Sequence, residues 1–153
     1  MTTASASHLD QNLDSALAAV AGEIGRTDAK ASLLLAFTGA ALAGLASIVG
    51  RDLPTATKAV GALAVLALGA AAVLLLLVVR PTLRGDDRAS FPYWARLRDD
   101  HSVRATMHND TRAARVRVLS AIAVSKFRGL RLAIDCILVA LALLVLAAMV
   151  ALV

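Results

Sequence analysis

The chain has few cysteines and few aromatic side chains. Its 153 residues include one cysteine, three phenylalanines, one tyrosine and one tryptophan. Because Cys136 has no second cysteine to pair with, an internal disulfide is excluded and we expect this thiol to pack in a core. Five aromatic residues and the lack of a recognisable RNA- or DNA-binding module argue against nucleic-acid recognition, in spite of a net charge of +5.

Motifs for catalysis are also missing. The sequence contains no phosphate-binding or dinucleotide-binding glycine loop, no HExxH or CxxC motif and no Gly-x-Ser-x-Gly elbow. His101 and His108 can share a helical face, but no acid supports them there, so we expect solvated surface and no metal site. Asp86–Asp87 and Asp99–Asp100 are adjacent pairs, which suit solvation or helix capping better than acid–base catalysis. The sequence therefore predicts no enzyme, no metal and no cofactor.

Charge is almost absent from three long stretches. Residues 31–50 and 59–79 contain no charged side chain, and residues 132–153 contain only Asp135. Each stretch reaches the roughly 20 residues that a helix needs to cross a bilayer. An apolar content of 59% and a mean hydropathy of +0.74 exceed those of soluble domains. The sequence predicts a membrane protein with three transmembrane helices.

The segment between the second and third stretches fixes the expected orientation. Residues 80–131 hold twelve of the sixteen Lys and Arg residues against five Asp, a local net charge of +7. Such a segment resists translocation, so it predicts a multi-pass inner-membrane protein with this region and the N-terminus in the cytoplasm. The link 51–58 and the C-terminus are then extracytoplasmic. The acidic first thirty residues do not read as a removable signal peptide.

Helical patterns extend the first span towards the N-terminus. Residues 1–8 are small and polar, and we expect them to be disordered. Residues 9–30 form a predicted cytoplasmic helix that no breaker separates from the first span, which gives one helix of roughly 40 residues. The apolar stripe of this helix consists of Leu9, Leu13, Leu17, Val20 and Ile24.

A second stripe precedes the third span. Asn109 or Asp110 is a candidate cap for a helix that begins near Thr111, and after them apolar residues and one cation recur at helical spacing without a breaker. Both long helices run from the cytoplasm outwards, so their extensions can lie side by side. The predicted fold is all-α, with three transmembrane helices and a small cytoplasmic helical bundle formed by extensions of the first and third helices. This second stripe consists of Val116, Leu119, Ala123, Lys126 and Leu130.

The polar region between the spans holds three further features. Phe91–Trp94 contains three of the five aromatics, which favours a place at the membrane interface, with a stacking platform for a ligand base as the alternative. The sequence from Trp94 to Met107 permits a short helix. Arg131 and Asp135, four residues apart, can pair at the entrance to the third span and lower the cost of the intramembrane acid.

Four motifs lie in a fixed order relative to the predicted spans. They are Asp28-x-Lys30-Ala31-x-Leu33-Leu34-x-Ala36-Phe37-x-Gly39, Val79-Arg80-Pro81-x-Leu83, Phe91-x-Tyr93-Trp94-Ala95-x-Leu97 and Leu119-Ser120-x-Ile122-Ala123-x-x-Lys126-Phe127-x-x-Leu130-Arg131-x-Ala133. In this order and spacing, the motifs together resemble the Pycsar transmembrane effector family. The resemblance covers about residues 20–150.

The resemblance implies a receptor for a cyclic pyrimidine mononucleotide, cyclic CMP or cyclic UMP, which a partner nucleotide cyclase makes on phage infection. Binding would impair the inner membrane and kill the infected cell. A chain this small, with so few polar groups in its spans, is expected to act as a homo-oligomer in the lipid bilayer. The alternative is a holin-like or structural small membrane protein that needs no ligand.

Cations on the family motifs are the candidates for holding the ligand phosphate. They are Lys126, Lys30, Arg80 and Arg131. For Arg80 and Arg131 the competing interpretation is contact with lipid headgroups. For Lys126 it is a buried ion pair with Asp28 on the neighbouring helix, so Asp28 and Asp135 are expected to serve in structural pairing.

Overall fold

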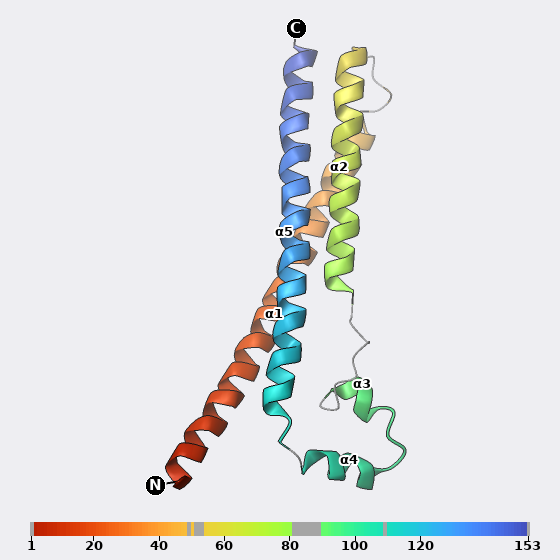
Figure 1. The fold of residues 1–153 in the computed structure, drawn as a ribbon. Helices are drawn as coiled ribbons and strands as arrows, with labels where there is room; N and C mark the ends of the chain where they lie inside the picture. Colours follow the sequence, from red (N-terminus) through yellow and green to blue (C-terminus); the bar gives the residue numbers. More distant parts are fainter. Residues whose placement is uncertain (1, 49, 51–53, 81–89, 109, 153) are drawn as a thin grey trace. The chain divides into compact units, whose positions relative to one another are not determined.

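The computed structural model describes residues 2–48, 50, 54–80, 90–108 and 110–152, and these residues are helices, turns and short connections without a strand. The helices are α1 (Thr2–Ala46), α2 (Thr55–Val79), α3 (Phe91–Trp94), α4 (Asp100–Met107) and α5 (Arg112–Ala151) (Figure 1). Three of them, α1, α2 and α5, are long and apolar enough to cross a membrane. The predicted all-α class is confirmed, and the three apolar helices indicate a membrane protein.

Two of the long helices, α1 and α2, begin at other residues than expected. α1 begins at Thr2, where a disordered N-terminus was expected. The first eight residues contain no Gly or Pro, and extending an existing helix costs far less than nucleating one. α2 begins at Thr55, so the second half of the predicted link 51–58 is helical. Its first turn is closed by the Lys58 N–H, which donates to the Pro54 carbonyl at 3.0 Å. Residues 51–53 and the Asp86–Asp87 pair lie outside the described residues.

The chain divides into two compact units. Unit 1 comprises residues 1–26 and 81–125, and unit 2 comprises residues 27–80 and 126–153. Both α1 and α5 therefore contribute to each unit.

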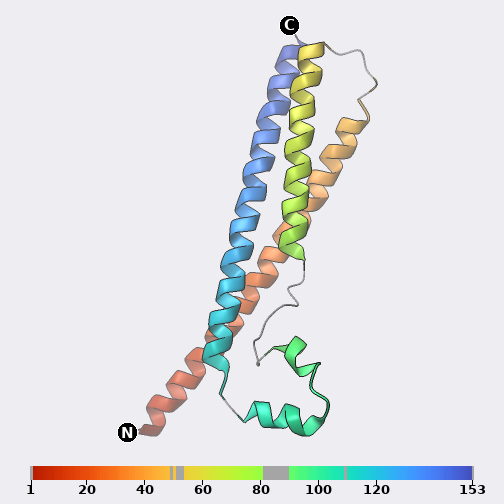
Figure 2. The same ribbon diagram turned by 45° about the vertical axis from the view of Figure 1, so that its right-hand side comes forward.

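The core of unit 2 is built from stripes at alternating steps of three and four residues. Figures 1 and 2 show α2 and α5 side by side. Alternating small and large residues let the two helices approach closely along such stripes. Cys136 packs against this core, as expected. The buried stripe of α2 is Ala64, Leu68, Ala71, Leu75 and Val78, that of α5 is Leu130, Ala133, Ile137 and Ala140, and α1 adds Thr27, Ala31 and Thr38.

Gly129 of α5 lies close against α2 in this core. A Cβ atom added there would lie 2.7 Å from Cγ2 of Val78, whose side chain is buried in the last turn of α2. Only a residue without a Cβ fits between the helices at this level. Gly39 and Gly44 of α1, in contrast, have open space around them.

Unit 1 contains α3, α4 and the first parts of α1 and α5. Asp99 interrupts the helix expected over 94–107: its extended backbone precedes α4, and its carboxylate accepts a hydrogen bond from the Ser102 N–H at 2.6 Å. Asp110 accepts from the Arg112 N–H at 3.0 Å and so caps α5, close to the expected start. Arg112 of α5 also forms salt bridges with Asp10 and Asp14 of α1, so the extensions of the first and third long helices do meet within this unit.

Candidate functional site

Lys126 lies on the inward stripe of α5 and forms an ion pair with Asp28 of α1. The ammonium Nζ donates to Oδ1 of Asp28, and the two side chains are 12% and 36% exposed. An ammonium removed this far from water needs a carboxylate to offset its lost hydration. The structure therefore shows the ion pair with Asp28, which was the competing interpretation for Lys126. This ion pair holds α1 against α5 within unit 2.

The other three candidate cations lie elsewhere on their helices. Lys30 is two residues after Asp28, so it projects about 200° around α1 from it, and Arg131 projects about 140° around α5 from Lys126. Both side chains are exposed, as is that of Arg80 at the C-terminus of α2. The structure thus pairs Lys126 with Asp28 and leaves the side chains of Lys30, Arg80 and Arg131 exposed. Their contact with a ligand stays a prediction.

Asp135 of α5 is exposed. Among the ion pairs of the described residues there is none between it and Arg131, so this pairing also stays a prediction.

A cluster around Arg112 in unit 1 was not anticipated from the sequence. The guanidinium of Arg112 contacts Asp14 at 3.2 Å, Asp110 at 3.0 Å and also Asp10. A planar guanidinium with five N–H donors suits such multiple contacts. One cation among three carboxylates leaves a local charge of −2, so this cluster ties helices together and does not attract an anion. The only sequence signal was the pair of acids four residues apart, Asp10 and Asp14, off the apolar stripe.

The cluster predicts an acid-sensitive contact. The hydrogen bond from the Arg112 side chain, followed by that from the Arg112 N–H, lowers the pKa of Asp110. A carboxyl group with a lowered pKa in the folded state stabilises the fold above its unfolded pKa of about 3.9, and this contribution is lost as the pH falls through the lowered value. Hydrogen exchange at residues 112–116 should therefore speed up when the pH falls from 6 to below about 3, after correction for intrinsic exchange. Asp110→Asn should remove this pH-dependent step, and a step of unchanged size in the variant would contradict the assignment.

Unit 1 also joins the aromatic cluster to a cation. The guanidinium carbon of Arg115 lies 5.8 Å from the ring centre of Trp94, within the range of a cation–π contact. A cation thus lies over one face of Trp94, and sites that stack nucleobases also combine aromatic rings with arginine. Whether Trp94 serves at the membrane interface or in stacking stays a prediction.

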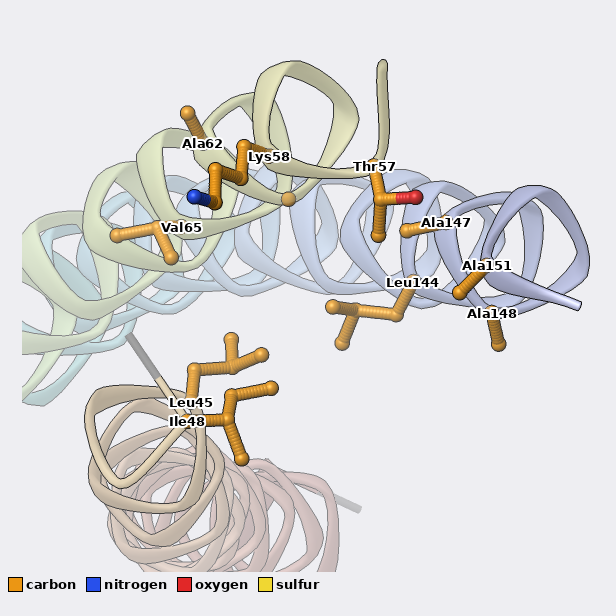
Figure 3. Close-up of a pocket in the computed structure, with 11 residues that line it drawn as sticks. Leu45, Ile48, Thr57, Lys58, Ala62, Val65, Leu144, Ala147, Ala148 and Ala151 are labelled. Atoms are coloured by element: carbon orange, nitrogen blue, oxygen red, sulfur yellow. The ribbon is translucent and has the colours of Figure 1, made fainter. Parts of the chain in front are cut away.

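A cavity of about 470 Å³ in unit 2 has an apolar lining and does not suit a charged nucleotide. It lies between α1, α2 and α5. Figure 3 shows Leu45 of α1 and Ile48, in the turn that follows α1, on one side and Val65 and Leu144 on the other. Lys58 is its one charged lining residue among the described residues, and the Thr57 hydroxyl is buried there. A phosphate, a sugar and a base need more polar partners than these.

Comparison with known proteins identifies the family. Residues 12–153 match the family described as the Pycsar effector protein domain. No curated protein and no solved structure matches the chain. Among the described residues, no group of three or more His, Cys, Asp or Glu side chains could hold a metal ion. Because the match covers most of the sequence and the three apolar helices suit a membrane effector, the chain belongs to the Pycsar effector family, the membrane effectors of an antiphage defence system.

Proposed function

We propose that this chain is a membrane effector activated by a cyclic pyrimidine mononucleotide, cyclic CMP or cyclic UMP, and that activation impairs inner-membrane integrity to cause abortive infection. Family membership over residues 12–153 supports the class of function. The observation that carries the ligand-operated mechanism is the ion pair between Lys126 and Asp28, because it holds a mostly buried cation at a contact between two long helices.

The proposed switch is an exchange of partners at Lys126. A cyclic mononucleotide carries one negative charge on its phosphate, which can replace the Asp28 carboxylate on the ammonium. The Asp28 carboxylate then turns towards water, to which its side chain, 36% exposed, already has access. A ligand shifts a conformational equilibrium only if it binds one arrangement better than the other. The arrangement in which Lys126 is free of Asp28 meets this condition, so ligand binding changes the packing of α1 against α5.

The remaining candidate cations have a secondary part in this proposal. Lys30, Arg80 and Arg131 lie on motif positions and are exposed, so they are available to attract the anion or to contact lipid headgroups. The basic segment 80–131, with its net charge of +7, is proposed to face the cytoplasm, where a partner nucleotide cyclase would supply the ligand. Several copies of the chain are proposed to act together in the inner membrane, and no catalytic step is required of them.

Binding and membrane damage can be measured on the same preparation. The full chain in lipid nanodiscs should bind cyclic CMP or cyclic UMP in calorimetry, and the same nucleotide should release dye from liposomes that contain the protein. Cyclic AMP, cyclic GMP and the linear 5′-monophosphate of the same base are the matched controls, and they should do neither. Dye release that depends on the amount of protein and not on any nucleotide would instead favour the ligand-independent, holin-like alternative.

A further inference from the structure

Asp135 is the one charged residue within 132–153, and it faces away from the core of unit 2. Its side chain is exposed, whereas Ala133 and Ile137, two residues before and after it, are buried in the core of unit 2. Two residues correspond to about 200° around a helix, so the carboxylate projects from the side of α5 opposite to α1 and α2.

The carboxylate also lies inside the third apolar stretch, one turn from its start. Gly129 is level with Val78 in the last turn of α2, where the second span gives way to Arg80. Asp135 is six residues further along α5, about 9 Å deeper along the helix axis. Aspartate has too short a side chain to reach the headgroups from this depth. An acid that faces lipid within a span is costly, so a carboxylate at this depth gains from a cationic partner.

The same side of α5 carries the complementary charge. Arg131 lies one turn before Asp135 and about 40° from it around the helix, and Arg128 lies two turns before it and about 20° away. Beyond Asp135 this face continues with Leu138 and the small Ala142. The side chains of all five residues are exposed. A pair formed only between Arg131 and Asp135 of one chain would still leave two charges against lipid.

We propose that this face of α5, formed by Arg128, Arg131, Asp135, Leu138 and Ala142, binds the same face of a second copy of the chain. Copies inserted in the same membrane with the same orientation place their α5 helices parallel. Arg131 of one copy then lies one turn, about 5–6 Å, from the level of Asp135 of the other, within reach of an arginine side chain. The contact is self-complementary, as a two-fold interface requires. On the C-terminal side of the charged residues, the small side chain of Ala142 lets the two α5 helices approach closely.

This inference deepens the proposed function, because it names the surface through which copies associate. Its test needs neither a nucleotide nor membrane damage. The proposed interface can therefore be refuted while the ligand-operated function holds, and the ligand-operated function can be refuted while the interface holds. The probe is the full chain, carrying two different affinity tags, in nanodiscs of a bacterial lipid extract.

The decisive experiment exchanges charges between copies. Arg131→Asp gives a chain with two acids on the face, and Asp135→Arg gives a chain with three cations there. Each variant expressed alone should lose about tenfold in co-purification of its two tagged forms, as a polar contact of 1–2 kcal/mol between membrane helices implies. The two variants expressed together should co-purify with each other at nearly the original level. Alkali extraction confirms that each variant is inserted. If the mixture associates no better than either variant alone, the interface is wrong.

A second experiment maps the face by disulfide formation. In a Cys136→Ser background, Ala142→Cys and Leu141→Cys place a thiol at nearly the same depth but about 100° apart around α5. Both positions are exposed, so access to lipid is matched. An added oxidant should cross-link two copies through position 142 at least about tenfold faster than through position 141, since only position 142 faces the second copy. Equal rates at the two positions, or a faster rate at 141, would overturn the proposal.

Discussion

Replacing Lys126 by alanine is expected to abolish nucleotide-triggered dye release while the three long helices remain inserted in the membrane. The change removes the cation proposed to receive the phosphate and leaves Asp28 without its partner. Breaking a fully buried ion pair costs about 3–5 kcal/mol, and the 36% exposure of Asp28 reduces the loss of stability here to below about 3 kcal/mol. Calorimetry with the activating nucleotide and thermal unfolding in detergent measure the two effects separately. Arg117→Ala, an exposed change on the same helix, is the matched control.

A double exchange separates ligand binding from helix pairing. The chain with both Asp28→Lys and Lys126→Asp regains an ion pair between α1 and α5 but carries its cation on the other helix. It should recover most of the thermal stability lost in Lys126→Ala and should still bind the nucleotide poorly. If the exchanged chain responds to the nucleotide as the original does, Lys126 serves only in pairing, and the proposed phosphate contact is wrong.

Gly129→Ala is expected to destabilise the packing of α2 against α5. The new Cβ would lie 2.7 Å from a methyl of Val78, whose branched side chain has little rotameric freedom and only 5% exposure. Overpacking of this kind costs about 1–3 kcal/mol, which outweighs the gain of at most about 1 kcal/mol in helix propensity from replacing glycine. Unfolding of the protein in mixed detergent micelles, followed by helical circular dichroism, measures the difference.

Two companion variants make the Gly129 result specific. Gly69→Ala in α2 meets no atom within 4 Å, so it should leave stability unchanged or raise it slightly. Adding Val78→Ala to Gly129→Ala should recover part of the loss, because it removes the methyl that the new Cβ meets. Additive effects of the two changes would show that the close approach at Gly129 does not limit packing.

The sequence was sufficient to predict the features that depend on local composition. The scarcity of charge in 31–50, 59–79 and 132–153 located the three long apolar helices, because the cost of a charge in a bilayer is large and independent of the fold. The stripe through Ala123 and Leu130 identified the inward face of α5, and both residues are buried. The same stripe placed Lys126 opposite Asp28, a pair that the sequence suggested as one of two alternatives.

The features that depend on distant contacts could not be predicted in this way. Arg112 is separated from Asp10 and Asp14 by about one hundred residues, and nothing in the sequence distinguishes it from the other cations of the basic segment. Gly129 shows the same limit, since its sequence context resembles that of Gly39, but only Gly129 lies against a neighbouring helix. The start of α1 at Thr2 depends on extension of a long helix beyond residues whose composition alone favours disorder.

The short link between α1 and α2 has a consequence for how the chain enters the membrane during its synthesis. α1 ends at Ala46 and α2 begins at Thr55, so the eight residues 47–54 connect the two apolar helices, and their two charges, Arg51 and Asp52, sum to zero. Whichever side this link faces, little hydrophilic chain has to be carried across. The two helices can therefore partition into lipid as a preformed pair, with α5 joining them after the basic segment has left the ribosome.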